Sequence, residues 1–115
     1  MSAKIIRCRH FPPTPFEAIT LGGVIFVRRN ARLTFGLVNH ESIHCRQQRE
    51  LLYLPFFVIY TVEWLVRFAL CFNSMRAYYN ISFEREAYAN GKNSEYLMHR
   101  KPYAWLSYLC RRHNR

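Results

Sequence analysis

The alternation of apolar and polar residues along the chain predicts a short β region followed by several helices. Two apolar runs, residues 17–21 and 24–28, are separated by Gly22-Gly23, and a Gly-Gly pair between β-forming residues is typical of a two-residue hairpin. The second run contains Ile25-Phe26-Val27, which are residue types that strands favour. Residues 1–16 are basic and then proline-rich, so we expect an extended arm there rather than a helix or a central strand.

The middle and the end of the chain predict helices. Residues 38–54 contain no glycine or proline and offer apolar residues for one buried side, so we expect a helix there, with Thr34 as the candidate cap near its start. Another helix is expected over residues 72–93, with Gly91 as its stop signal. After a Lys-Pro break, residues 103–110 predict a short amphipathic helix.

Residues 51–72 form an apolar stretch of 22 residues. As a straight helix the stretch would be about 33 Å long, close to the thickness of a bilayer core. Pro55 is expected to end or kink the preceding helix, and the charges of Glu63 and Arg67, four residues apart, would each be costly in lipid. A small domain also needs a central helix. We therefore expect a buried or interfacial helix here, with a membrane span as the alternative.

The composition is that of one folded domain with a strongly basic balance. The chain has 115 residues, of which 50% are hydrophobic, and this is enough for a single domain with one modest core. The formal net charge is +10, and much of it lies near the two ends, including a basic tail at 111–115. Such charge indicates an anionic partner, which is a membrane surface, a nucleic acid or an acidic protein, although no nucleic-acid-binding module is visible. Solvated termini that aid solubility are the alternative explanation.

The cysteines are spaced as separate thiols. Cys8, Cys45, Cys71 and Cys110 form neither a CxxC pair nor a zinc-finger spacing. We therefore expect free thiols in a reducing compartment, which favours the cytoplasm. Residues 1–11 carry charges but no apolar core, so no cleaved signal peptide is expected. On a helix Cys45 points about 100° away from the histidine beside it, so we do not count it as a metal ligand.

The strongest chemical signal is the pattern HExxH at residues 40–44. On a helix His40 and His44 share a face, so their ring nitrogens can meet at one zinc ion. Glu41 lies beside that point rather than on it, where the general base for a metal-activated water belongs. A chance match with two surface histidines is the alternative, because four letters recur often by accident.

A later helical segment, residues 83–90, supplies candidates for a third ligand. Glu84 and Glu86 are two residues apart and point to different sides of a helix, so they are not expected to share one metal. The face around Glu84 is small or apolar, which predicts burial against the HExxH helix, and a buried carboxylate needs a partner such as a metal. Glu86 is the reserve ligand. Alternatively, both glutamates are surface residues that pair with Arg85 or Asn90.

Together the two segments resemble the gluzincin type of zinc metallopeptidase, including the HtpX-like membrane proteases, the BlaR-like sensor peptidases and several small bacterial metallopeptidase-like proteins. The resemblance rests on residues 40–44, on Gln47-Gln48 and on the run Glu84-Arg85-Glu86-Ala87-Tyr88. It implies that His40, His44 and Glu84 bind zinc and that Glu41 is the base. Tyr88 stands where the family usually has an aspartate that orients a ligand histidine, so it is expected to supply that hydrogen bond without a charge.

The sequence therefore predicts one α+β, mostly helical, zincin-like domain over residues 1–115, in which an N-terminal β-hairpin packs on the HExxH helix and on two to three further helices. The expected function is zinc-dependent hydrolysis of a peptide or protein substrate, with the strand at 24–28 as an edge that holds the substrate backbone. The alternatives are a zinc-stabilised scaffold without activity and a membrane-peripheral binding protein. The candidate oxyanion donors are Tyr88, Tyr96, His99 and Arg100.

Overall fold

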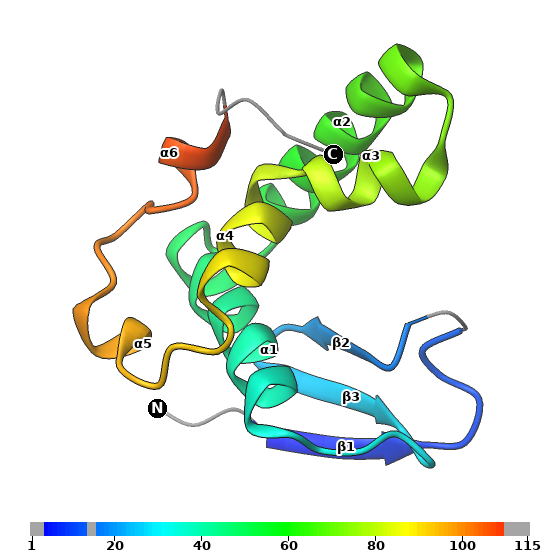
Figure 1. The fold of residues 1–115 in the computed structure, drawn as a ribbon, viewed down its shortest axis with the longest axis vertical. Helices are drawn as coiled ribbons and strands as arrows, with labels where there is room; N and C mark the ends of the chain where they lie inside the picture. The colour runs from blue at the N-terminus through cyan, green and yellow to red at the C-terminus, as the bar shows by residue number, and fades with distance from the viewer. Residues whose placement is uncertain (1–3, 14–15, 110–115) are drawn as a thin grey trace.

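The computed structural model of the protein describes residues 4–13 and 16–109, and it is an α+β fold dominated by helices (Figure 1). The basic tail at 111–115, Cys110 and the remaining parts of the N-terminal arm lie outside the described residues. In chain order the elements are β1 (Lys4–Cys8), β2 (Ala18–Leu21), β3 (Val24–Arg28), α1 (Phe35–Glu50), α2 (Leu54–Cys71), α3 (Ser74–Asn80), α4 (Ser82–Asn90), α5 (Tyr96–His99) and α6 (Leu106–Leu109).

The predicted hairpin is confirmed. β2 and β3 pair antiparallel, with Leu21 opposite Val24 across the turn. Gly22 and Gly23 both have positive φ, 60° and 87°, which is the conformation that a tight two-residue hairpin turn needs and that glycine adopts without strain.

The N-terminal arm contains a strand that the sequence did not reveal. β1 pairs parallel with β3, so the sheet order is β1-β3-β2. The prediction that Val24–Arg28 is an edge strand is therefore wrong, because β3 is the central strand of the three. The physical reason is that β1 pairs with the side of β3 that β2 leaves free. The edge strand nearer to α1 is β2.

Helix α1 is close to its prediction at the start and shorter at its end. The Thr34 hydroxyl oxygen accepts the backbone N–H of Leu37 at 3.1 Å and caps the first turn. The helix ends at Glu50 because the backbone turns left-handed at Leu52 and Tyr53, with φ of 58° and 71°.

Helix α2 is not a buried central helix, which was one of the two predicted possibilities, and the interfacial possibility stays a prediction. Pro55 lies in its first turn, where the missing backbone N–H costs nothing. Among the residues of α2, all of which the structure describes, Phe56 alone is buried. By length and composition α2 is also able to cross a membrane. Its outer face is exposed because α1, rather than α2, occupies the middle of the fold.

The helix predicted over residues 72–93 is divided in two. Asn73 caps α3 through its side chain, and the backbone becomes extended at Ile81, with ψ of 135°. Glu63 of α2 causes the break, since its carboxylate accepts both the hydroxyl and the backbone N–H of Ser82, the latter at 2.8 Å. α4 then starts in a new direction, with Ile81 buried in the core.

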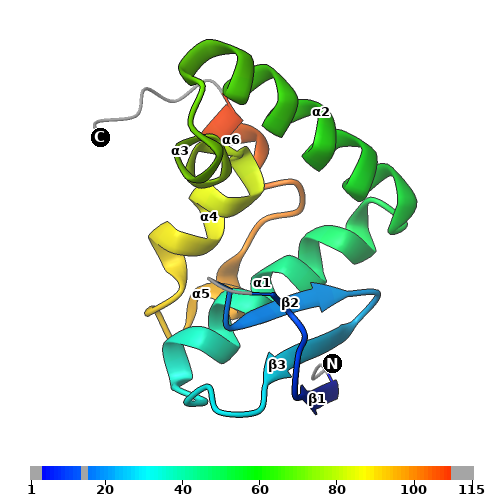
Figure 2. The same cartoon turned by 90° about the vertical axis from the view of Figure 1, so that its right-hand side faces the viewer.

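Two apolar clusters hold the fold together on the two sides of α1. One joins the sheet to α1 through Ile25, Val27 and Ala31. The other lies among the helices and contains Phe56, Ile81, Phe83 and Trp105. α1 thus lies between the sheet and the remaining helices (Figure 2). Its own buried residues are mostly polar, which is unusual for a central helix.

The contact between Glu63 and Ser82 is expected to stabilise the fold. Glu63→Ala removes the acceptor for two donors at the start of α4, and Ser82 is fully buried, so we expect the free energy of unfolding to fall by about 1–3 kcal/mol. Urea denaturation measures the change. Glu95→Ala, at an exposed position, is the control and should stay within about 0.5 kcal/mol of the wild type. Equal losses in both variants would contradict this role of Glu63.

Candidate metal centre

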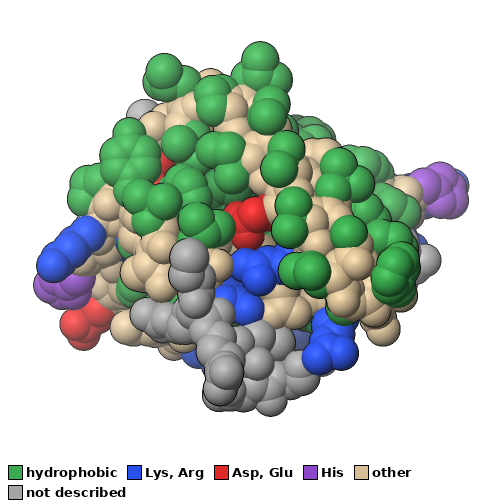
Figure 3. Space-filling view, turned by 90° about the horizontal axis from the view of Figure 1, so that it is seen from above, with side chains coloured by type: hydrophobic (Ala, Val, Ile, Leu, Met, Phe, Trp, Pro, Cys, Tyr) green, Lys and Arg blue, Asp and Glu red, His purple; other side chains and the backbone are tan. Residues whose placement is uncertain are grey.

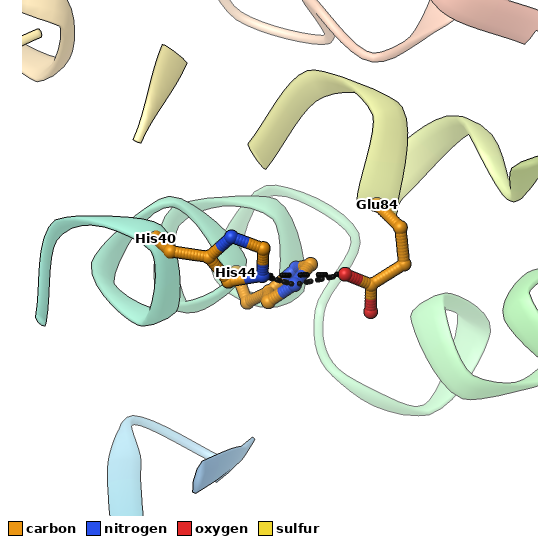
Figure 4. Close-up of side chains that lie close together, drawn as sticks. All are labelled: His40, His44 and Glu84. Carbon is orange, nitrogen blue, oxygen red and sulfur yellow. Dashed lines mark hydrogen bonds and ion pairs between the residues drawn. The ribbon is translucent and has the colours of Figure 1, made fainter. Parts of the chain in front are cut away.

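Two imidazoles on one face of α1 meet at one point. His40 and His44 are four residues apart, and both side chains project toward α4 (Figure 4). Their Nε2 atoms lie 3.2 Å apart, and the rings meet edge to face with centroids at 4.8 Å. His40 is 9% exposed and His44 5%. The pair therefore presents two nitrogen donors to one enclosed position.

Glu84, in the first turn of α4, brings a carboxylate to the same position. Its Oε1 atom lies 3.0 Å from His44 Nε2 and 3.3 Å from His40 Nε2. The side chain is buried, at 4% exposure of the residue. The structure thus brings together the three predicted ligands, which come from segments 40 residues apart in the chain.

The three donor atoms fit one zinc ion. A tetrahedral zinc ion with bonds of about 2.0–2.1 Å holds its donors about 3.3–3.4 Å apart. The observed separations are 3.2, 3.0 and 3.3 Å, so the atoms form one face of such a tetrahedron within a few tenths of an ångström. Two imidazoles and a carboxylate are also a donor set that zinc uses in catalytic sites.

Gln47 determines which nitrogen of His44 faces the carboxylate. The Gln47 amide nitrogen donates to the carbonyl of Phe83 and to Glu86, each at 3.0 Å. The amide oxygen of Gln47 therefore faces His44 Nδ1, at 2.8 Å. Because this oxygen can only accept, Nδ1 carries the proton. In neutral His44 the lone pair of Nε2 then points toward Glu84, which is the form that a metal ligand requires.

Glu86, the reserve ligand, belongs to a different site. It is fully buried and pairs with Arg100, while Tyr96 donates its hydroxyl proton to Oε2 at 2.6 Å. Arg100 also binds Glu50 at the end of α1 through two hydrogen bonds, of 3.0 and 2.9 Å. Glu86 is thus a support for Gln47 rather than a donor to the histidine pair.

Tyr60 of α2 holds the second oxygen of Glu84. Its hydroxyl donates to Glu84 Oε2 at 2.6 Å. Burial and the nearby Glu84 charge raise the pKa of Tyr60 well above its usual value, so the hydroxyl stays protonated and acts as a donor. Oε1 of Glu84 is left to face the histidines.

Glu41 lies beside the three donors, and a residue of the sheet holds its side chain by a hydrogen bond. Thr20 of β2 donates its hydroxyl to Glu41 Oε1 at 2.7 Å, and Oε2 lies 4.0 Å from His40 Nε2. Gln48 fixes β2 in turn, because its side chain donates to the carbonyl of Thr20 at 2.7 Å and accepts the N–H of Gly22 at 2.9 Å. The carboxylate is therefore near the metal position without belonging to the triangle of donors.

Tyr88 contacts a ligand histidine, but not in the predicted way. Its ring packs edge to face on His40 with centroids 4.5 Å apart. Its hydroxyl lies 3.2 Å from the hydroxyl of Tyr78 instead of bonding an imidazole nitrogen. Burial raises the pKa of Tyr88 to about 12. Tyr88 thus buttresses the His40 ring by packing, because the helix directs its hydroxyl toward α3.

The other oxyanion candidates lie away from the three donors. Tyr96 and Arg100 are both bound to Glu86, and His99 is exposed and pairs with Glu95 on α5. Tyr88 alone among the four predicted donors adjoins the described ligands, and its partner Tyr78 was not predicted.

The charges of the three ligand side chains stabilise one another when no metal is bound. Burial alone would lower the pKa of His44, but the charge of Glu84 and a hydrogen bond to it outweigh burial and raise that pKa to about 9. Burial would likewise raise the pKa of Glu84, yet the charge of His44 and hydrogen bonds from both histidines hold it well below its usual range. A positive charge, proton or metal, is thus required beside this carboxylate.

Two cavities open next to the donors. One, of about 340 Å³, is mostly apolar and lies between β2 and α2, with Phe16, Ile19, Phe56 and Tyr60 among its lining residues. The other, of about 440 Å³, lies toward the N-terminus of α1 and is lined by His40 and Tyr88. Glu41, Ala18 and Tyr78 line both cavities. A continuous hollow surface therefore follows β2 past the candidate ligands.

Several supporting residues were missed by the sequence analysis. Asn39 donates to the carbonyls of Gly91 and Asn93, at 2.8 and 3.1 Å, and ties the end of α4 to α1. Nothing in its sequence context signals this. Tyr60 could have been found, because it lies three residues before Glu63 and seven before Arg67, on the same helical face as these polar positions of an otherwise apolar stretch.

The predicted separate thiols agree with the described residues, in which Cys8, Cys45 and Cys71 are free. Cys45 is not part of the donor triangle, and burial raises the pKa of its thiol to about 11.

Comparisons with family models, curated proteins and solved structures give no significant match to this chain.

Replacement of Glu84 is expected to weaken zinc binding far more than replacement of Glu86. Glu84→Gln removes the anionic donor and should lower zinc affinity by more than roughly 100-fold. Glu86 contacts His44 only through Gln47, so Glu86→Gln should lower zinc affinity by at most roughly tenfold. Titration calorimetry measures the zinc affinity of both variants at a temperature below their unfolding midpoints, and circular dichroism checks that both are folded. The reverse order would make Glu84 the wrong third ligand.

Zinc binding is expected to weaken as the pH falls. Because the folded pKa of His44 is raised to about 9, zinc must displace a proton from this imidazole at lower pH. Between pH 8 and pH 6 the apparent affinity should therefore drop by about tenfold per pH unit for one displaced proton. Competition with a chelating dye calibrated at each pH gives the slope. An affinity that is constant over this range would exclude His44 as a ligand.

Proposed function

We propose that the chain is a zinc-dependent metallopeptidase of gluzincin type. The observation that carries the proposal is the position of Glu41 beside the convergent donors of His40, His44 and Glu84, at the junction of two cavities. This is the arrangement expected for the motif HExxH with a glutamate on a later helix.

The donor set favours a catalytic rather than a purely structural zinc ion. Structural zinc sites are closed by four protein ligands, whereas catalytic sites use three and keep the fourth position for water or substrate. Among the described residues, three side chains supply the donors, and the hollow surface along β2 adjoins them. Zinc held in this way lowers the pKa of water to about 7 and polarises a carbonyl group.

Glu41 is the general base in this proposal. Its carboxylate accepts the proton of the attacking water and returns it to the leaving nitrogen as the peptide bond breaks. The hydrogen bond from Thr20 holds one carboxylate oxygen and leaves the other directed toward the donor triangle. Tyr78 and Tyr88, whose hydroxyls face each other at 3.2 Å, are the nearest candidates to stabilise negative charge on the substrate.

An extended peptide is the substrate shape that this surface favours. β2 is the edge strand beside the donors, so its outward backbone groups can pair with an extended chain, apart from the Thr20 carbonyl that already accepts the Gln48 amide. All four residues of β2 line the smaller cavity, and Ala18 also lines the other, so the strand borders the hollow surface. The apolar lining of the smaller cavity, with Phe16 and Phe56, favours a substrate side chain that is apolar or aromatic.

Glu41→Gln is expected to abolish hydrolysis and to leave zinc bound. The three ligands remain, but proton transfer, worth roughly 10²–10⁴-fold in rate, is lost. Zinc content and cleavage of a fluorogenic peptide library are measured side by side, with Glu95→Gln at an exposed position as the matched control.

Activity that survives Glu41→Gln would contradict the proposed mechanism. Wild-type protein that is fully loaded with zinc and yet cleaves nothing in the library would instead favour the zinc-stabilised scaffold. Wild-type protein that binds no zinc would exclude both functions.

A further inference from the structure

The outward face of α2 is a continuous apolar stripe. Its side chains recur every three or four residues along the 18-residue helix, so they form one face about 27 Å long. We call this face the outer stripe, and its exposed members are Leu54, Pro55, Val58, Thr61, Val62, Leu65, Val66, Ala69 and Leu70. Thr61 is its single polar residue. Figure 3 shows hydrophobic side chains gathered over the end of the molecule that carries α2 and α3.

The polar residues of α2 point the opposite way, toward the protein. Glu63 binds Ser82, Tyr60 binds Glu84, and Arg67 donates to the carbonyl of Leu109 at 2.9 Å. This is the reverse of the pattern in a soluble surface helix, whose apolar side faces the core and whose charged side faces water. Apolar patches of this extent mark a protein or membrane interface.

The exposed charges of the described residues are almost all positive. Five of the seven carboxylates are internal or paired, and Glu17 and Glu95 are the two that lie exposed. The exposed cationic side chains are Lys4, Arg7, Arg9, Arg29, Arg32, Arg49, Arg76, Lys92 and Lys101. The exposed charge of the described residues is thus mostly positive, and it attracts an anionic partner.

We propose that α2 lies in the interface of an anionic lipid bilayer, with the outer stripe inserted at the level of the acyl chains and with the net positive charge of the protein attracting it to the anionic headgroups. A second copy of the chain is a poor occupant, because two molecules of net charge +10 repel each other. A helix that spans the bilayer is excluded by the inner face, where Glu63 and Arg67 are bound to protein groups that would also have to enter the lipid.

Docking of α2 would bring the cavity beside the candidate metal centre close to the membrane. The inner face of α2 supplies Phe56, Phe57 and Tyr60 to the lining of the smaller cavity. One helix diameter, about 10 Å, then separates this cavity from the lipid. The proposal itself does not depend on the metal or on hydrolysis.

Vesicle flotation with the purified full chain tests the proposal. The vesicles contain either phosphatidylcholine alone or a mixture with about one third phosphatidylglycerol, which supplies the negative surface charge. The test variant is Leu70→Glu on the outer stripe, and the matched control is Met98→Glu on α5, at the far side of the molecule (Figure 1). Leu70 is 77% exposed and Met98 79% exposed, so both substitutions add the same charge at positions that do not support the fold.

The wild type is expected to float with the anionic vesicles and to bind the neutral ones more weakly. Leu70→Glu should reduce binding by at least about tenfold, since it removes a side chain worth that much on burial, whereas Met98→Glu should change binding by less than about threefold. Carbonate at high pH should release the wild type from the vesicles.

Three results would overturn the proposal. They are failure of the wild type to bind either vesicle, equal loss of binding in the two variants, and retention in the membrane pellet after carbonate extraction, which would indicate a span. A dimer in solution that Leu70→Glu dissociates, without vesicle binding by the wild type, would assign the outer stripe to a second copy instead.

Discussion

The burial of the Glu84 carboxylate is the constraint on which the candidate site and much of the fold depend. A carboxylate that is 4% exposed cannot keep its charge unless positive charge and hydrogen-bond donors surround it. The fold meets this need from two helices, with the histidines of α1 on one oxygen and Tyr60 of α2 on the other. A proton on His44 suffices when no metal is present, and in the proposed function a zinc ion would take the place of that proton.

The polar interior of α1 follows from the same constraint. Gln47 and Gln48 are buried side chains that would be costly in an ordinary core, yet each amide satisfies its donors and acceptors. Gln47 connects the site to α4 and to the Glu86–Arg100 pair, while Gln48 connects it to β2. Displacement of either side chain would leave buried polar groups unpaired on two elements at once, which makes the orientation of α1 specific.

Much of the local structure was predictable, because its signals lie within a few residues. The glycine pair of the hairpin, the Thr34 cap and the helical spacing of His40 and His44 depend on neighbours in sequence. Long-range pairings were not predictable. The parallel strand β1 needs β3 beside it, and the break at Ile81 needs Glu63 from another helix. Single-sequence patterns carry no information about such partners.

The two faces of α2 show why mean hydropathy alone cannot decide whether this helix belongs to the protein core or to a membrane. A sequence window averages over all sides, so the charges that argue against a membrane and the apolar residues that argue for one are counted together. In the fold they separate, because Glu63 and Arg67 turn inward to bind the protein and the outer stripe faces away from it. One helix can therefore bind the carboxylate of the candidate metal centre through Tyr60 and still present on its opposite side an apolar surface in which Thr61 is the single polar residue.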